Sequence, residues 1–312
     1  MSIVAEAPGY IQVFSDGSVK RFEPEIATAS IEPSNGYMSK DVVIDSSKPI
    51  LGRMYLPESS VHQHFPVLVY FHGGGFCIGS TTWLGYHVFL GDLSVSSKSI
   101  ILSVDYRLAP ENRLPIAYED CYSALEWLIK NIEFEPWLER ADLSQLFLSG
   151  DSAGGNIVHQ VAIQAITSEV FRGRLKGLLP IHPYFGSEKR TELEMDNGSA
   201  GGVEMNDMFW RLSLPQGSNR DYFGCNFENA QLSVAEWSQF PAVIVFVAGL
   251  DLLKERGVTY AEFLKKKKGV KSHVKVVEAE EQVHVYHVFH PESEATRLLQ
   301  NQMSDFINSF RK

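Results

Sequence analysis

The stretch that decides the fold is Leu146–Asn156, LFLSGDSAGGN, in which a short apolar run ends in a glycine-rich turn. The run LFLS predicts a buried strand, and the apolar residues over Asn156–Thr167 predict a helix. Gly150, Ser152 and Gly154 supply the spacing G-x-S-x-G between that strand and that helix. Glycines suit such a turn because the serine backbone is strained and neighbouring backbone passes close by. We therefore interpret Ser152 as a candidate nucleophile.

The same alternation of strand and helix continues from about residue 50 to the end of the chain. The continuous apolar runs VLVYF, IILSVDY and AVIVFVAG are typical of strands that are covered on both faces. The expected strands are Gly52–Leu56, Pro66–Phe71, Ser99–Asp105, Leu146–Ser149, Gly177–Ile181, Ala242–Ala248 and Val274–Glu278. The expected helices are Ala117–Asn131, Asn156–Thr167, Thr259–Lys267 and Glu292–Phe310. This alternation predicts a mostly parallel α/β sheet with helices on both faces.

Two segments interrupt this pattern. Residues 1–50 carry short strand signals and little periodicity, whereas residues 185–240 are rich in Gly, Asn, Glu and isolated aromatic residues, with a short helix expected at Met205–Leu212. Insertions of this kind in an α/β sheet are where lids and pockets are usually built. Phe185, Phe209 and Trp210 are therefore candidate pocket residues, and core packing is an equally good explanation for each of them.

A second glycine-rich loop follows the strand VLVYF. Its sequence is His72-Gly73-Gly74-Gly75-Phe76, and three glycines in a row add backbone entropy that is lost on folding. Such a loop makes sense where backbone amides must point into a cavity. The amides of Gly73 and Gly74, with that of Ala153, are candidate donors of an oxyanion hole, each contributing roughly 3–4 kcal/mol of transition-state stabilisation. The phosphate-binding patterns G-x-x-x-x-G-K-[ST] and G-x-G-x-x-G do not occur in this chain. For His72 we favour a structural role in the loop.

A serine nucleophile needs a base, and the base needs an acid that orients it. Asp251 follows the run AVIVFVA, and His284 lies in the loop after VKVVEA, so both are expected just past a strand's end. Their order after Ser152 is the order that accompanies a G-x-S-x-G turn. Taken singly, Asp251 could instead cap a helix and His284 could be a core histidine. Together they are our candidates for the acid and the base.

Four rival residues are less well placed. His287 and His290 are expected to begin the final helix or to cover its surface, and His273 starts its strand at the wrong end. Glu255 competes with Asp251, but it is expected to lie a turn into the following helix.

The composition excludes several classes of function. The 312 residues carry 28 basic and 38 acidic side chains, a net charge of −10, which disfavours nucleic acids and anionic membranes as partners. The dense basic run Lys265–Lys268 is typical of the polar end of a helix. Cys77, Cys121 and Cys225 form no C-x-x-C pair, so we expect neither a zinc site nor a redox motif.

The expected location is the cytosol. The N-terminal residues lack a basic segment followed by an apolar one, so no secretion signal is predicted. No apolar run reaches the about 18 residues that a membrane span needs. An odd, sparse number of cysteines also fits a reducing compartment.

Three motifs together resemble the hormone-sensitive-lipase-like family, and more closely its plant carboxylesterases. They are HGGGF, the YRLAPE of Tyr106–Glu111, and GDSAGGN. The resemblance extends from FSDGSVKRF near the N-terminus through Trp210–Asp221 to the region of His284. It implies an α/β-hydrolase fold with a mixed eight-stranded sheet in a single domain over residues 1–312, capped by elements at about 1–35 and 185–240. It also implies a triad of Ser152, Asp251 and His284, with an oxyanion loop at Gly73 and Gly74.

Residue identity separates the chain from non-esterase members of that family. The gibberellin receptor lacks the catalytic histidine, which this chain keeps as His284, and the isoflavanone dehydratases carry threonine where Ser152 stands. Val285 is a departure, because many relatives have glycine or alanine there, and a branched side chain at this position narrows the pocket or tilts the histidine. We expect a serine carboxylesterase that acts on small, largely apolar esters without metal or cofactor. A lyase, dehydratase or cyclase and a ligand-binding receptor are the alternatives, and the oligomeric state is not predicted.

Overall fold

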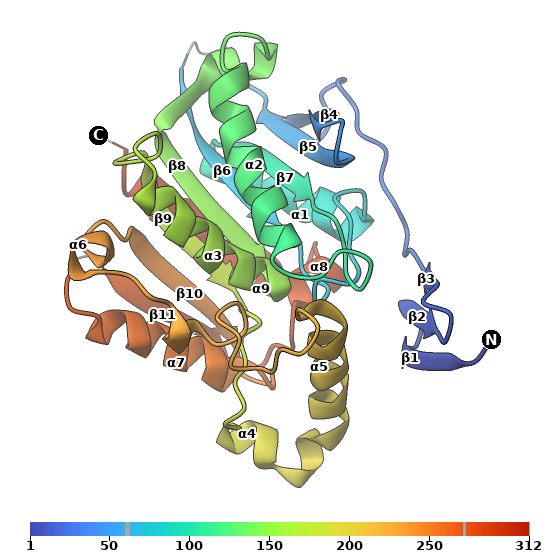
Figure 1. The fold of residues 1–312 in the computed structure, drawn as a ribbon. Helices are drawn as coiled ribbons and strands as arrows, with labels where there is room; N and C mark the ends of the chain where they lie inside the picture. Colours follow the sequence, from blue (N-terminus) through green and yellow to red (C-terminus); the bar gives the residue numbers. More distant parts are fainter. Residues whose placement is uncertain (60–62, 271–272, 312) are drawn as a thin grey trace.

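All seven apolar runs predicted as strands lie in one eight-stranded sheet (Figure 1). The computed structural model describes residues 1–59, 63–270 and 273–311. The strand order is β11-β10-β9-β8-β6-β7-β5-β4; β4 and β5 pair antiparallel, as do β5 and β7, and all other pairs are parallel. The strands are β4 (Tyr37–Asp45), β5 (Ile50–Pro57), β6 (Phe65–Phe71), β7 (Ile100–Asp105), β8 (Ala141–Asp151), β9 (Leu175–Ile181), β10 (Ala242–Ala248) and β11 (Val274–Ala279). The predicted mixed, mostly parallel sheet is confirmed, with β4 as an additional strand.

Helices cover both faces of this sheet, as predicted. Figure 1 shows α2 and α3 in front of the sheet and α1 and α9 behind it. The helices of the domain built around this sheet are α1 (Leu84–Ser97), α2 (Ile116–Asn131), α3 (Ala153–Thr167), α7 (Lys254–Lys266), α8 (Tyr286–Phe289) and α9 (Glu294–Asn308), with a 3₁₀ turn at Pro136–Arg140. α1 was not predicted, and α3 begins directly after Ser152, three residues earlier than predicted.

The core explains the patterns seen in the sequence. Every residue of β6 is buried, because helices cover both faces of this central strand, and its apolar run is therefore continuous. In α2, Ala117, Cys121, Leu125 and Leu128 are all buried, which confirms the apolar face predicted from their spacing. All three cysteines are buried and unpaired.

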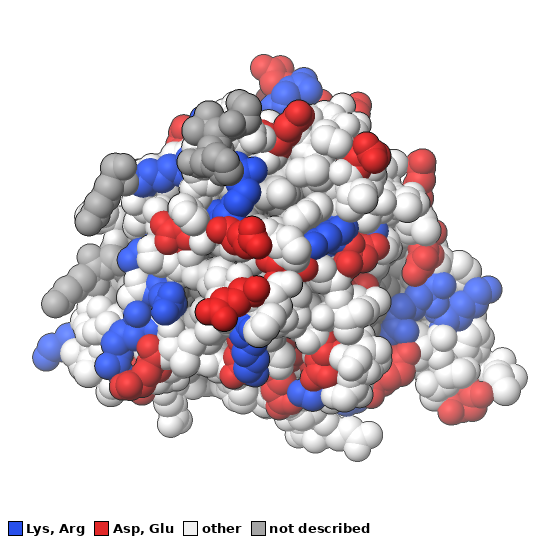
Figure 2. Space-filling view, turned by 90° about the horizontal axis from the view of Figure 1, so that it is seen from above, with Lys and Arg blue, Asp and Glu red and all other residues white. Residues whose placement is uncertain are grey.

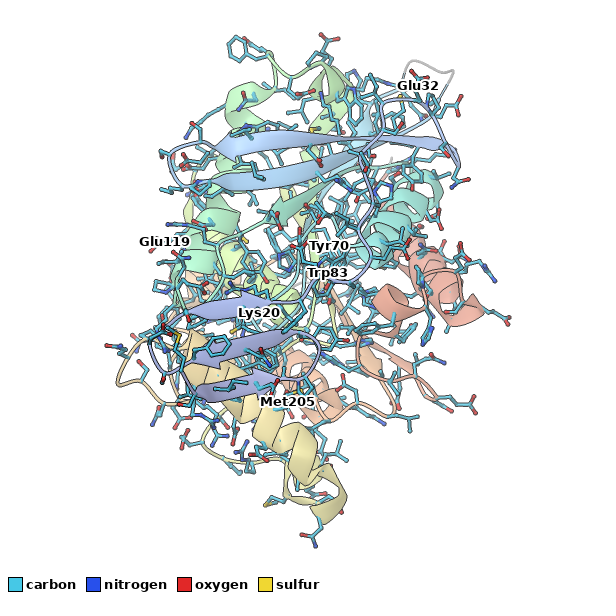
Figure 3. The ribbon with its side chains drawn as sticks, turned by 90° about the vertical axis from the view of Figure 1, so that its right-hand side faces the viewer. Lys20, Glu32, Tyr70, Trp83, Glu119 and Met205 are labelled. Carbon is cyan, nitrogen blue, oxygen red and sulfur yellow. The ribbon has the colours of Figure 1, made fainter. Side chains whose placement is uncertain are left out.

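Parts of the two segments that interrupt the pattern lie outside the sheet: residues 3–21 lie to its right and residues 192–213 lie below it in Figure 1. The N-terminal segment forms a separate three-stranded sheet, β1 (Ile3–Ala7), β2 (Ile11–Phe14) and β3 (Val19–Arg21). The later segment holds α4 (Glu192–Met195), α5 (Ala200–Ser213) and α6 (Val234–Trp237), with 3₁₀ turns at Asn197–Ser199 and Phe227–Asn229. Figure 3 shows β1–β3 on the side of α5 that faces the viewer.

Arginines fasten both segments to the central domain. Arg21 at the end of β3 donates from Nε to the carbonyl of Cys77 at 2.7 Å and forms a two-pronged ion pair with Glu111. Arg256 in α7 donates to both carboxylate oxygens of Glu194 in α4, at 2.9 and 2.7 Å. The side chains of Arg256 and Glu194 are nearly inaccessible, so this pair is a buried anchor.

Charged side chains of both signs are interspersed over the face shown in Figure 2. Lys265 and Lys266 occupy the last turn of α7, which confirms the prediction that the basic run ends a helix. Among the helices that the structure describes, none combines the length and the apolar character needed to cross a bilayer.

Candidate active site

Ser152 lies at the sharp turn between β8 and α3, in the strand–turn–helix context that the motif predicted. Its backbone has φ 52° and ψ −117°, a conformation that L-residues rarely adopt. A Cβ atom on Gly154 would lie 1.8 Å from the carbonyl oxygen of Phe71, and one on Gly150 would lie 2.5 Å from the same atom. The end of β6 therefore crowds the turn, which is why both flanking positions are glycine.

The structure brings the three candidate triad residues into one hydrogen-bonded chain. Asp251 lies between β10 and α7, and His284 lies between β11 and α8. Nδ1 of His284 is 2.7 Å from Oδ2 of Asp251, and its Nε2 is 2.9 Å from Oγ of Ser152. The other oxygen of Asp251 accepts the backbone N–H of Leu253 at 2.9 Å, so the carboxylate has one defined orientation.

The charges of this chain support proton transfer at the serine. Burial lowers the pKa of the His284 imidazole, but the charge and hydrogen bond of Asp251 outweigh burial and raise this pKa overall. Burial raises the pKa of Asp251, and the neighbouring imidazole outweighs it, so the pKa of this carboxyl is lowered. An ionised Asp251 keeps the ring proton on Nδ1, which leaves Nε2 free to accept the serine proton.

The rival residues are not members of the hydrogen-bonded chain from Asp251 through His284 to Ser152. His287 belongs to the short helix α8 and His290 follows its end, so the expectation that they begin the final helix is wrong. His273 is exposed at the start of β11. Glu255 lies in the first turn of α7, as predicted, and its carboxylate accepts the backbone N–H of Leu193 at 2.9 Å.

His72 is buried in the glycine loop, and its contacts are structural. Its Nδ1 lies 2.8 Å from the carbonyl oxygen of Gly73, and its ring stacks on Tyr106 with centroids 4.3 Å apart. These contacts fit the structural role that we favoured from the sequence.

The amide of Gly73 is already used inside the fold, which corrects its place among the expected oxyanion donors. It donates to the hydroxyl of Tyr86 at 2.9 Å and to Oδ1 of Asp151 at 3.1 Å. Gly74 and Gly75, with φ 102° and 58°, then turn the chain in a way that glycine accommodates best. In the described part of the chain, the structure gives no acceptor for the amides of Gly74, Gly75 or Ala153. These three amides are therefore the candidates for binding an external oxygen.

Asp151 is a buried residue of the site that the sequence reasoning missed. Its carboxylate accepts the hydroxyl of Tyr70 at 2.7 Å and that of Tyr86 at 3.0 Å, besides the Gly73 amide. Burial raises its pKa to about 6, although the two tyrosine hydroxyls oppose this shift. Figure 3 shows Tyr70 inside the molecule. Asp151 thus ties the serine turn to the glycine loop, and the only sequence signal for it is an acid directly before Ser152.

The aromatic pocket candidates divide into two groups. A Cβ atom on Gly75 would lie 2.7 Å from the ring of Phe209, so this ring packs against the glycine loop. Trp210 stacks on Tyr184 with centroids 4.3 Å apart, and Phe185 is buried against Tyr260 at 4.8 Å. Phe209 is thus the aromatic candidate beside the site, whereas Phe185 packs in the core and Trp210, besides its stacking, lines a cavity with Arg113 and Asp207.

Val285, the fourth pocket candidate, is half-buried and has φ 47° and ψ 35°. This left-handed conformation is the reason why glycine suits the position after the histidine, and a valine there is strained. His182, Asp251 and His284 also form a group whose potential metal-ligand atoms lie within 4.8 Å of one another. Asp251 and His284 direct these atoms at each other and at Ser152, which suits proton transfer better than metal binding.

Comparisons with known proteins identify the family of this chain. Residues 68–288 match the model of a family described by the α/β-hydrolase fold. An Arabidopsis thaliana protein named probable carboxylesterase 6 is 40% identical, covering 81% of this chain and 77% of its own. A 2-hydroxyisoflavanone dehydratase of Glycyrrhiza echinata is 30% identical, covering 97% of this chain and 95% of its own. The solved structure of a Pyrobaculum calidifontis esterase is similar with a TM-score of 0.73 at 28% identity, covering 90% of this chain and 86% of the other.

The matched region contains the glycine loop, the serine turn and both later members of the hydrogen-bonded chain. The family match and the structural neighbour therefore assign most of the chain to the same fold. The chain belongs to the α/β-hydrolase family and, within it, to the plant carboxylesterases of the hormone-sensitive-lipase-like group.

Proposed function

We propose that this protein is a serine carboxylesterase that works through an acyl-enzyme. Oγ of Ser152 attacks the ester carbonyl while Nε2 of His284 takes its proton, and the same imidazole then protonates the departing alcohol. Water, deprotonated by His284, releases the acid and regenerates the serine. The observation that carries the proposal is the continuous chain from Asp251 through His284 to Ser152, with contacts of 2.7 and 2.9 Å.

We assign the oxyanion hole to the amides of Gly74, Gly75 and Ala153. Their freedom from internal acceptors within the described residues supports this assignment. Each such donor contributes roughly 3–4 kcal/mol of transition-state stabilisation. Ala153 is also the first residue of α3, so the N-terminus of this helix favours negative charge beside Ser152.

The proposed substrates are small, largely apolar carboxylic esters. The ring of Phe209 against the glycine loop supports an apolar wall beside the reacting carbonyl. The proposed reaction uses no metal and no cofactor, and the proposed partner is the small-molecule ester alone, with neither nucleic acid nor membrane. The cytosolic location remains a prediction from the sequence.

The test combines turnover with labelling. The purified protein is mixed with p-nitrophenyl esters of increasing acyl length and, separately, with a serine-directed organophosphonate. We expect hydrolysis of the short esters, one phosphonate on Ser152, and loss of both in Ser152→Ala. Replacing an exposed histidine away from the site, His273→Ala, is the matched control and leaves both intact. An enzyme that still turns over esters after Ser152→Ala would contradict the mechanism.

A non-hydrolytic reaction is the second candidate, because a 2-hydroxyisoflavanone dehydratase is among the relatives. A positioned base and an oxyanion site also serve proton abstraction and elimination. Reaction in ¹⁸O-labelled water separates the two candidates. A hydrolase incorporates the label into the acid product, whereas a lyase or cyclase releases a product to which no water has been added.

A further inference from the structure

Two residues with strained backbone conformations lie next to each other at the loop that carries His284. His182, directly after β9, has φ 45°, and Val285, directly after His284, has φ 47°. L-residues rarely adopt such angles, and a β-branched side chain does so least of all. Strain of this kind persists only where the surrounding structure holds it, and it gathers at functional sites.

A single hydrogen bond joins these two residues. The backbone N–H of Val285 donates to Nδ1 of His182 at 2.9 Å. His182 is itself anchored to the sheet, because its own amide donates to the carbonyl of Phe246 in β10 at 2.8 Å. The residue before it, Ile181, accepts the amide of Ser152 at 2.9 Å. The imidazole of His182 therefore links the loop of His284 to the strand that also supports the serine.

The surroundings of His182 leave Nδ1 as an acceptor. The side chain is only 2% exposed, and its ring lies against those of His284, Tyr286 and His287, with centroids 5.7, 5.6 and 5.9 Å away. Burial, assisted by the nearby His284, holds the pKa of His182 well below its ordinary value. The ring is thus neutral at physiological pH, and the nitrogen that faces the Val285 amide carries no proton.

We propose that His182 is a positioning residue: by accepting the N–H of Val285, it holds the strained turn that aims His284 at Ser152. The proposal rests on the esterase function proposed above. Without the acceptor, Val285 is free to relax to a negative φ, and the peptide that it shares with His284 rotates with it. A displacement of the base by about 1 Å costs on the order of 100-fold in rate.

The variants separate this role from a general contribution to packing. His182→Ala removes the acceptor, and we expect kcat to fall about 10- to 100-fold with little change in KM. In His182→Asn the side-chain oxygen takes the place of Nδ1, so most of kcat returns. His159→Ala is the matched control, because it removes another buried imidazole, which pairs with the hydroxyl of Tyr260 at 3.0 Å. It lowers stability without changing kcat.

A second change tests the coupling with the strained turn. Glycine adopts a positive φ without strain, so Val285→Gly makes the acceptor dispensable, and the double variant with His182→Ala recovers kcat. Asn35→Gly is the control for this change, because Asn35 also has a positive φ, 52°, but lies exposed. It does not rescue His182→Ala.

The outcomes are decisive for this residue. The proposal is overturned if His182→Ala keeps the wild-type kcat, if His182→Asn is as impaired as His182→Ala, or if Val285→Gly rescues no better than Asn35→Gly. Should His182→Ala fail to fold, folding becomes the readout: recovery with Val285→Gly alone supports the proposal, and failure with both glycines overturns it. A wild-type protein with neither ester turnover nor phosphonate labelling would instead defeat the esterase function.

Discussion

Replacing Asp251 by asparagine tests how the carboxylate controls the imidazole. One oxygen of Asp251 accepts the N–H of Leu253 at 2.9 Å, and the other faces Nδ1 of His284 at 2.7 Å. Asparagine has a single oxygen, and the Leu253 amide requires an acceptor, so the side-chain NH₂ turns toward His284. The imidazole then accepts at Nδ1 and carries its proton on Nε2. In this tautomer it cannot take the proton of Ser152.

The expected loss follows from this tautomer. In enzymes with a Ser-His-Asp triad, the same change lowers kcat by about 10⁴-fold while the geometry stays intact. At about 1.36 kcal/mol per tenfold change in rate, this corresponds to roughly 5.5 kcal/mol of barrier. The side chains have nearly the same size and Leu253 keeps its acceptor, so we expect little loss of stability.

The assay is the initial rate of p-nitrophenyl ester hydrolysis at saturating substrate, divided by the concentration of active enzyme to give kcat. Asp142→Asn is the matched control, because this acid lies near the start of β8, at the end of the strand away from Ser152, and its carboxylate accepts hydrogen bonds from Ser144 and Gln145. It leaves kcat unchanged. If Asp251→Asn keeps more than about a tenth of the wild-type kcat, the carboxylate does not set the tautomer and the reasoning is refuted.

Three further predictions concern charge. Because Asp251 raises the pKa of His284, we expect kcat/KM to fall on acidification with a midpoint above the ordinary histidine pKa of about 6.5. A measured pH–rate profile with a lower midpoint contradicts this prediction. Burial raises the pKa of Asp151 to about 6, so its contribution to stability is complete below about pH 4 and is lost as the pH rises through 6, by roughly 3 kcal/mol. Urea unfolding from pH 4 to 7 shows this loss relative to Asp151→Asn, and parallel curves for the two proteins would exclude it. Arg256→Met removes the two direct hydrogen bonds of Arg256 to the Glu194 carboxylate and leaves Arg190 at 3.9 Å as its remaining cationic partner, so we expect the free energy of unfolding to fall by about 1.5–3 kcal/mol; an unchanged Tm would show that the anchor is dispensable.

The sequence alone predicts the strands of the buried sheet well, because a strand covered on both faces must be apolar along its whole length. β6 and β10 are such strands. The edge strand β4 was missed because only Tyr37 and Ser39 of its residues are buried, and the rest are half-buried or exposed. An edge strand carries no continuous apolar signal.

The helix α1 was missed for a different reason. It contains Gly85 and Gly91, residues that weaken helices, and its buried face includes the polar Ser94 and Ser97 whereas the apolar Val95 is exposed, so the apolar residues do not mark that face. A Cβ atom on Gly85 would lie 2.0 Å from the carbonyl oxygen of Val288, and one on Gly91 would lie 2.1 Å from the ring of Tyr37. These glycines mark close contacts with α8 and β4, and such contacts exist only in the folded chain.

The glycine loop shows how much of the site the local sequence can predict. Three successive glycines predict that amides face a cavity, but they do not specify which amides do so. Packing decides this, because Tyr86 and Asp151 occupy the amide of Gly73, while Gly74 and Gly75 turn the chain away from internal acceptors.

The amino-acid sequence by itself determined the order of serine, acid and base along the chain, their positions at strand ends, and the sheet that brings those ends together. Periodicity and turn chemistry are local properties, so they can be read without coordinates. The pairing of His182 with Val285 and the link from Asp151 to the glycine loop were decided only by the tertiary structure. Each depends on a hydrogen bond between residues that are far apart in the chain. The local sequence around one of these residues therefore gives no sign of the other.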